Sequence, residues 1–186
     1  MIPAKEENGF SLLQIIVALA LFTLAIVMVV SLYSLSNRTY NKASRTAEMA
    51  QNARVALNRM TREIRQSPQI ITDLSSDRSG AKSEIMFRDG HDLEETTYIN
   101  YYLDDTDLRR SEWAYYFPSE ENIYVEYNAR DEDGDSPEKK VLSDHLVGEY
   151  FQNMEFWGTQ ELVKIYFNLK INGEEFEIGS SVYSRN

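Results

Sequence analysis

The sequence contains no cysteine, and only four prolines, eight glycines and two histidines in 186 residues. Without cysteine, the chain can form neither a disulfide framework nor a thiolate metal site. No proline or glycine lies between Phe10 and Ser67, so no helix breaker interrupts that stretch. No charged residue lies between Glu7 and Arg38. These absences leave a long N-terminal stretch that favours a helix and is uncharged over its first half.

Patterns typical of catalytic sites are also missing from the sequence. His91 and His145 lie far apart, and no G-x-S-x-G element or glycine-rich phosphate loop occurs. Carboxylate pairs such as Asp104 with Asp105 are expected in a chain this acidic and do not indicate acid–base chemistry. The sequence therefore predicts a protein that is not an enzyme.

The stretch from Phe10 to Leu35 is apolar except for six residues with polar side-chain atoms: Ser11, Gln14, Thr23, Ser31, Tyr33 and Ser34. A helix needs about 20 mostly apolar residues to cross a bilayer, so this run is long enough. A secretory signal would have a shorter run followed by a small-residue cleavage site, and neither feature is present. We therefore expect a membrane-spanning helix over residues 10–35.

The pattern becomes amphipathic over residues 36–67. Apolar and small residues recur every three or four positions, at Ala43, Ala47, Ala50, Ala53, Leu57, Met60 and Ile64. Pro68 then ends the helix, which we expect to run from about residue 10 to 66. The other side carries basic and polar residues, among them Arg45, Asn52, Arg59 and Arg62. This side is either a face for nucleic acid or lipid headgroups, or a solvated face that complements an acidic domain.

Residues 68–186 alternate with period two between turn signals, which predicts β-strands. The expected strands are Ser83–Arg88, Thr96–Leu103, Leu108–Trp113, Asn122–Tyr127, Lys140–Leu142, Asn153–Trp157, Leu162–Leu169 and Glu174–Tyr183. Asn172-Gly173 predicts a tight hairpin turn between the last two, whereas Leu146–Tyr150 fits a strand or a turn. The fold class is α+β: a long N-terminal helix, transmembrane and then amphipathic, packed on an antiparallel β-sheet.

Charge is unevenly distributed along the chain. Residues 37–66 carry seven basic and two acidic side chains, a net charge of +5. Because the whole chain carries −11 and residues 1–9 carry −1, residues 67–186 carry −15. Contacts to phosphates supply most of the affinity for nucleic acids, so no direct nucleic-acid partner is expected for the acidic segment. Such a segment suits water or basic partners.

Two clusters in the acidic segment each have two interpretations. Asp131, Asp133 and Asp135 alternate around Gly134, which suits a weak Ca²⁺ site or a solvated acidic loop. The twelfth position of an EF-hand loop would be Leu142 instead of Glu, so no cofactor is assigned. An aromatic group forms either core or a partner surface, with core favoured; it comprises Trp113, Tyr115, Tyr116, Phe117, Tyr124 and Tyr127.

The N-terminal residues Gly9-Phe10-Ser11-Leu12-Leu13, with the apolar run that follows, resemble the class III signal of type IV pilins and pseudopilins. The resemblance implies that residues 1–9 are a leader, removed by prepilin peptidase between Gly9 and Phe10. It implies N-methylation of Phe10, and it implies that residues 10–35 are kept as a membrane anchor and then as a filament-core helix.

Two further segments resemble J-type minor pseudopilins of type II secretion and W-type minor pilins. These are the helix end Ala53–Ser67 and the hairpin Thr96–Trp113. The resemblance implies a pilin-like fold and a minor subunit that assembles into, primes or tips a type II secretion pseudopilus. The alternatives are a minor pilin of a type IV pilus or DNA-uptake pseudopilus, and a single-pass membrane binding protein that does not assemble. The implied partners are prepilin peptidase, other pilins or pseudopilins, and the inner-membrane assembly platform.

Position 14 departs from the family pattern, which usually has Glu at the fifth mature position. Gln14 can form a hydrogen bond with an N-terminal amine but cannot neutralise its charge. It is either a tolerated neutral substitute in a subunit of low abundance, or a mark of a subunit at the filament tip.

Two signals disagree about the orientation in the inner membrane. The basic residues Arg38, Lys42 and Arg45 would keep the C-terminal side in the cytoplasm. The pilin-type signal implies the opposite, with residues 68–186 in a periplasmic or extracellular domain. We favour the second orientation because a processing site is read by a specific enzyme, whereas a charge bias is statistical.

Overall fold

The computed structural model describes residues 11–91 and 95–185. The chain divides between Ser44 and Arg45 into two compact units. Helix α1 (Leu12–Gln66, 55 residues) is the regular structure of the described part of the first unit, and it also supplies the first 22 residues of the second. The predicted end of the helix before Pro68 is confirmed, and the last turn closes with Ser67 N–H donating to the Glu63 carbonyl at 3.0 Å.

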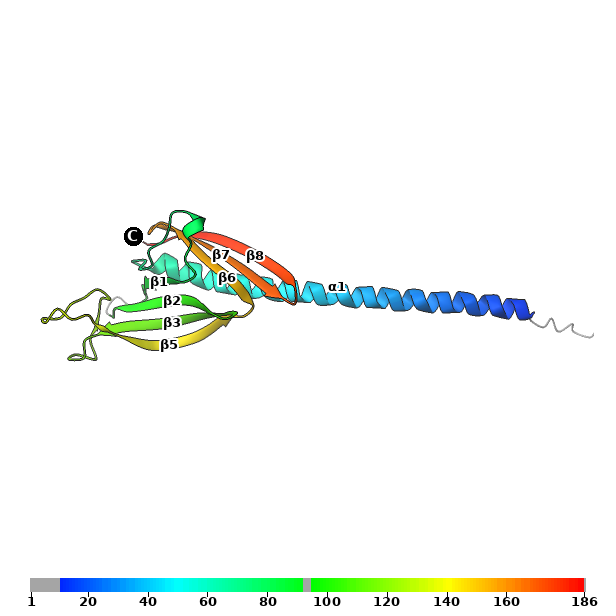
Figure 1. The fold of residues 1–186 in the computed structure, drawn as a ribbon, viewed down its shortest axis with the longest axis horizontal. Helices are drawn as coiled ribbons and strands as arrows, with labels where there is room; N and C mark the ends of the chain where they lie inside the picture. Colours follow the sequence, from blue (N-terminus) through cyan, green and yellow to red (C-terminus); the bar gives the residue numbers. More distant parts are fainter. Residues whose placement is uncertain (1–10, 92–94, 186) are drawn as a thin grey trace, which may run out of the picture. The chain divides into compact units, whose positions relative to one another are not determined.

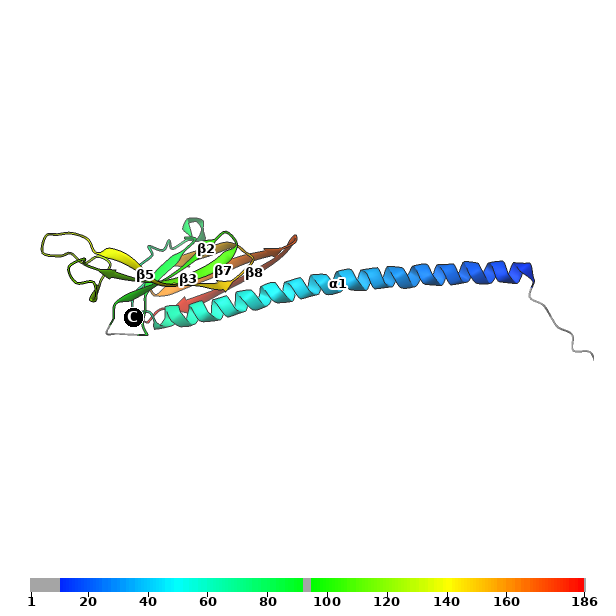
Figure 2. The same cartoon turned by 90° about the horizontal axis from the view of Figure 1, so that it is seen from below.

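The second unit contains two antiparallel sheets, seen in Figures 1 and 2. Sheet A comprises β1 (Ile85–Arg88), β2 (Thr97–Asp104), β3 (Asp107–Tyr116), β4 (Tyr124–Val125) and β5 (Glu138–Gly148). Strand β2 lies between β1 and β3, and β3 pairs with both β4 and β5. Sheet B is a meander of β6 (Phe151–Gly158), β7 (Leu162–Ile171) and β8 (Glu174–Tyr183). A single-turn 3-10 helix, η1 (Arg78–Gly80), precedes β1.

The expectation of a single sheet is therefore wrong, although the α+β class is confirmed. The chain leaves sheet A at Gly148, turns through Tyr150 with a φ of +74°, and starts sheet B at Phe151. Phe151 is fully buried, and its N–H donates to the Thr106 carbonyl at 2.9 Å. The segment left open in the sequence, Leu146–Tyr150, is thus the end of a strand followed by the turn between the sheets.

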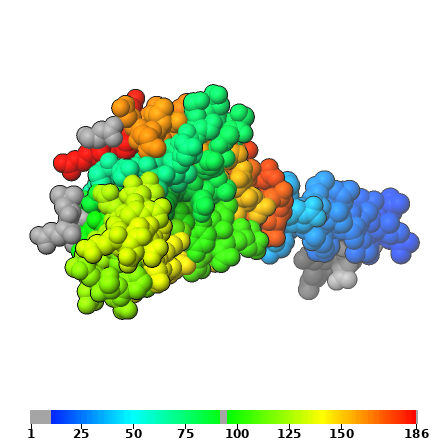
Figure 3. All heavy atoms as spheres, turned by 60° about the vertical axis from the view of Figure 1, so that its left-hand side comes forward, coloured from blue at the N-terminus to red at the C-terminus, as the bar shows by residue number. Residues whose placement is uncertain are grey.

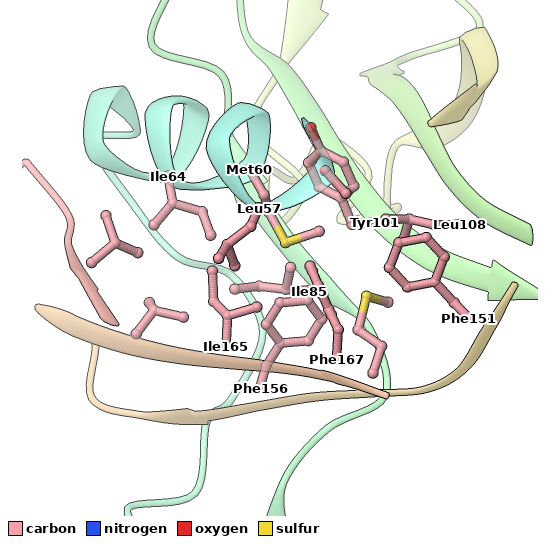
Figure 4. Close-up of a cluster of buried hydrophobic side chains, with 14 of the residues drawn as sticks. Leu57, Met60, Ile64, Ile85, Tyr101, Leu108, Phe151, Phe156, Ile165 and Phe167 are labelled. Atoms are coloured by element: carbon pink, nitrogen blue, oxygen red, sulfur yellow. The ribbon is translucent and has the colours of Figure 1, made fainter. Parts of the chain in front are cut away.

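The core of the second unit lies between α1 and the two sheets. Figure 4 shows Leu57, Met60 and Ile64 of α1 among side chains from both sheets, including Ile85 and Phe156. The predicted apolar stripe is confirmed from Ala53 onward, but the buried face begins at Met49 and Ala47 is exposed. Amphipathic spacing therefore extends further toward the N-terminus than the packing does.

The predicted hairpin turns are confirmed by backbone conformation. Asn172 and Gly173 both have positive φ, +50° and +89°, as a two-residue type I′ turn requires. Asp105, between β2 and β3, also has a positive φ of +56°. A third turn requires glycine at position 90 because the backbone there lies close to the helix. A Cβ on Gly90 would lie 2.0 Å from the Gln66 carbonyl oxygen. The chain leaving β1 thus passes directly against the C-terminal end of α1.

The strand lengths predicted from the sequence are too short for β5 and too long for β4. Strand β5 has eleven residues, whereas only Lys140–Leu142 was expected, and β4 has two where six were expected. Most of β5 is exposed, so it has no alternating buried face for a sequence pattern to reveal. Backbone pairing with β3 holds it in place. The connection between β4 and β5 extends away from the sheet in both ribbon views (Figures 1 and 2).

The core interpretation of the aromatic group 113–127 is wrong. Its six members are half-buried or exposed in the structure. On β3 the fully buried apolar residues are Leu108 and Ala114, so Trp113 and Tyr115 point to the opposite face of sheet A. There Tyr115 packs edge-on against Tyr98, with ring centroids 5.4 Å apart.

Candidate functional site

The described part of the first unit presents a largely apolar surface from Leu12 to Leu35. Every large apolar side chain from Leu12 to Leu35 is at least 47% exposed. Monomeric soluble proteins rarely expose a contiguous apolar patch of this kind. By length and composition, α1 could cross a membrane, as the sequence predicted.

Two hydroxyl groups within this segment donate hydrogen bonds to the backbone of the helix itself. The Thr23 hydroxyl donates to the Ala20 carbonyl at 2.9 Å, and the Ser31 hydroxyl donates to the Val27 carbonyl at 2.8 Å. In hydrocarbon an unsatisfied polar group costs several kcal/mol, so these bonds lower the cost of placing the segment in an apolar medium.

Ser11 and Gln14 form a reciprocal pair at the start of α1. Ser11 N–H donates to Gln14 Oε1 at 2.9 Å, and Gln14 N–H donates to Ser11 Oγ at 3.4 Å. This is a capping box, which satisfies two of the free N–H groups at a helix N-terminus. Gln14 lies on one exposed face of α1 with Ile15, Ala18, Leu19 and Phe22. The predicted cleavage and methylation residues, Gly9 and Phe10, lie outside the described residues.

The calcium candidates form a local turn. Asp131 Oδ1 accepts backbone N–H groups from Asp133 at 3.1 Å and from Asp135 at 2.7 Å. This loop lies at the surface of the second unit (Figure 3). Within residues 11–91 and 95–185, no group of three or more histidine or acidic side chains could hold a metal ion. The geometry gives the calcium interpretation no support.

A buried ionic cluster joins α1 to sheet A. Glu63, 6% exposed, accepts the Tyr101 hydroxyl at 2.7 Å and Arg110 Nε at 3.1 Å. Arg59, one turn earlier on α1, lies 3.3 Å from the other carboxylate oxygen. Arg110 is itself buried and also approaches Glu112 at 3.5 Å. The cluster therefore fixes the end of the helix to β2 and β3.

The electrostatics of the cluster follow from its burial. Burial first, and then the charge of Glu63, raises the pKa of the Tyr101 hydroxyl well above its ordinary value. Burial alone would lower the pKa of Arg110, but the Glu63 carboxylate more than offsets this and leaves that pKa raised. Tyr101 therefore stays neutral and Arg110 stays charged at physiological pH.

Sequence reasoning missed this cluster, although one signal was present. Glu63 lies three residues after Met60 and next to Ile64, so it occupies the apolar stripe of the helix. A carboxylate on a buried stripe requires a cationic or donor partner. Its partners, Tyr101 and Arg110, come from strands 38 and 47 residues away. Pairing over such a distance is set by tertiary structure.

Comparison with protein-family models, curated proteins and solved structures gives no match to this chain.

Proposed function

We propose that this protein is a minor structural subunit of the pilin and pseudopilin class, anchored in the inner membrane by residues 10–35. The exposed apolar segment from Leu12 to Leu35 carries the proposal. It suits lipid before assembly and the helices of neighbouring subunits afterwards. The small residues Ala18, Ala20 and Ala25 permit the close helix approach that such packing needs.

The start of the helix supports a minor role for the subunit. The side-chain oxygen Oε1 of Gln14 accepts the Ser11 N–H, and this side chain carries no charge to offset a free amine. A repeating subunit would have to bury that uncompensated amine at every position in the filament, which is costly. In a filament that contains only one or a few copies of the subunit, the unfavourable free energy of the buried amine arises at only those few positions.

The proposed orientation places the acidic, strand-rich unit outside the cytoplasm. The proposed assembly is a type II secretion pseudopilus, of which the chain would be a J-like subunit. A type IV pilus and a DNA-uptake pseudopilus are the alternatives within the same class. Co-purification of the full chain with the minor subunits encoded beside it distinguishes these assemblies.

Processing is the direct test of the proposal. The full chain is co-expressed with an active prepilin peptidase, and the mature protein is analysed by intact mass spectrometry. We expect a product that begins at N-methylated Phe10. Gly9→Val is expected to block cleavage, whereas the matched leader variant Ala4→Val is expected to be processed normally.

An intact Met1 terminus, beside a reference prepilin that the same peptidase cleaves, would overturn the proposal. That result would favour a single-pass binding protein that does not assemble. A reporter fused after Lys42 tests orientation separately: activity of alkaline phosphatase at this point supports an external strand-rich unit, and activity of a cytoplasmic reporter contradicts it.

A further inference from the structure

The face of sheet A that points away from the core carries a pocket. Its centre is a row across three strands, in which Asn100 of β2 pairs with Ser111 of β3, and Ser111 pairs with Asp144 of β5. Tyr102 and Trp113 lie beside the row, and Glu84 and Val141 complete the lining. The cavity has a volume of about 220 Å³ and lies wholly within the second unit.

A buried hydroxyl without a partner lies in this pocket. Ser111 is 2% exposed, and its Oγ has no hydrogen-bond partner in the structure. Buried polar atoms are almost always paired, because an unpaired one loses the free energy of its contacts with water. An unpaired hydroxyl in the lining of a pocket can form a hydrogen bond with water or with a bound ligand.

The remaining polar groups of the pocket are mostly acceptors. Asp144 accepts the Tyr102 hydroxyl at 2.8 Å and Arg109 Nε at 3.0 Å, which fixes its carboxylate at the edge of the pocket. Glu84 receives a long contact of 3.5 Å from the Asn100 amide. Arg109 already pairs with the Asp144 carboxylate, so Glu84 and the Ser111 hydroxyl are the acceptors that a ligand with N–H donors and a positive charge can fill.

The aromatic lining indicates the same type of ligand. The chain's own Lys139 places its Nζ 2.7 Å from the centre of the Trp113 ring. The Trp113 ring is therefore covered by the chain's own cation, which leaves the Tyr102 ring for a ligand. Tyr102 supplies a second ring in the lining, which can take a planar cation by stacking.

We propose that this pocket binds an arginine side chain of a basic partner protein. A guanidinium is planar, permanently charged and carries five N–H donors in a fixed arrangement, which matches the Glu84 carboxylate, a hydroxyl and an aromatic ring. The volume is below the roughly 300–1,000 Å³ of pockets for drug-sized ligands, which suits a single side chain. The net charge of −15 on residues 67–186 attracts a basic protein toward this face. The site does not depend on the assembly role proposed above.

Fluorine NMR of the full chain in detergent micelles tests the site. The chain contains two tryptophans, so 5-fluorotryptophan labelling gives one signal from the pocket, Trp113, and one internal control, Trp157. Nα-acetyl-arginine amide is the probe, and Nα-acetyl-citrulline amide is its neutral counterpart of the same shape. We expect the arginine probe to shift the Trp113 signal in a saturable way, the citrulline probe to leave it unchanged, and Trp157 to stay constant.

Variants identify the acceptors. Glu84→Gln, at an exposed position with few contacts, is expected to weaken binding of the arginine probe by about tenfold, through loss of a charge-assisted hydrogen bond. Glu175→Gln removes an equal charge on β8 of sheet B and is expected to leave binding unchanged. Equal shifts with arginine and citrulline, or no saturable shift with either, would overturn the proposal. So would a response to a neutral methyl glycoside alone, which would indicate a carbohydrate site.

Discussion

Replacing Glu63 by glutamine keeps the size of the side chain but removes the negative charge that Arg110 and Tyr101 contact. Breaking a buried ion pair by removing one partner typically costs about 3–5 kcal/mol, because the other charge stays buried. Arg110 still has Glu112 at 3.5 Å, and that side chain is 30% exposed, so it compensates only in part. We therefore expect Glu63→Gln to lower the free energy of unfolding by about 3 kcal/mol.

Urea unfolding of the full chain in detergent micelles measures this loss, with near-UV circular dichroism reporting on the aromatic residues of the strand-rich unit. With a denaturant slope of about 2 kcal/mol per molar urea, the midpoint should fall by about 1.5 M. The matched control, Glu175→Gln, breaks an exposed pair with Lys170 and should cost less than about 1 kcal/mol.

A double variant separates lost pairing from a general loss of packing. Glu63→Met with Arg110→Met replaces the pair by apolar side chains, which is often neutral for a buried ion pair. The double variant should therefore be more stable than Glu63→Gln alone. A stability of Glu63→Gln within about 1 kcal/mol of the wild type, or a double variant less stable than Glu63→Gln, would contradict a stabilising role of the buried pair.

Four other changes test local features. Gly90→Ala places a Cβ against the Gln66 carbonyl oxygen, so the backbone must shift; we expect a loss of about 2 kcal/mol in the same urea assay. Gly173→Ala, at a φ of +89°, should lower the free energy of unfolding by about 1 kcal/mol, and an unchanged urea midpoint would contradict this expectation. The raised pKa of Tyr101 means that the unfolded state releases this proton first, so stability is full below about pH 10 and falls above it. Urea midpoints across that range should fall less steeply in Tyr101→Phe. Ser11→Ala removes an N-cap worth about 1 kcal/mol and should speed amide hydrogen exchange in the first turn, while later turns stay unchanged.

Local patterns predicted the elements whose periodicity or turn chemistry is strong. The long helix ends where Pro68 predicts, and Asn172-Gly173 forms the turn that its backbone preferences favour. Strand β5 was mostly missed because its exposed residues have no alternation between buried and solvent-facing positions. The division into two sheets was missed because it depends on Phe151 reaching the core, which neighbouring residues do not encode.

The sequence by itself determined the apolar segment of the first unit, because hydrophobicity and the absence of helix breakers are properties of consecutive residues. It also places an uncharged glutamine, Gln14, at the fifth position counted from Phe10, and the minor-subunit proposal depends on this residue. Only the tertiary structure decided which charges are buried. Glu63 meets Arg110, and Ser111 lies in a pocket between Asn100 and Asp144, because strand pairing brings distant residues together. The cost of burying a polar group depends on that environment, so it becomes visible only when the fold is complete.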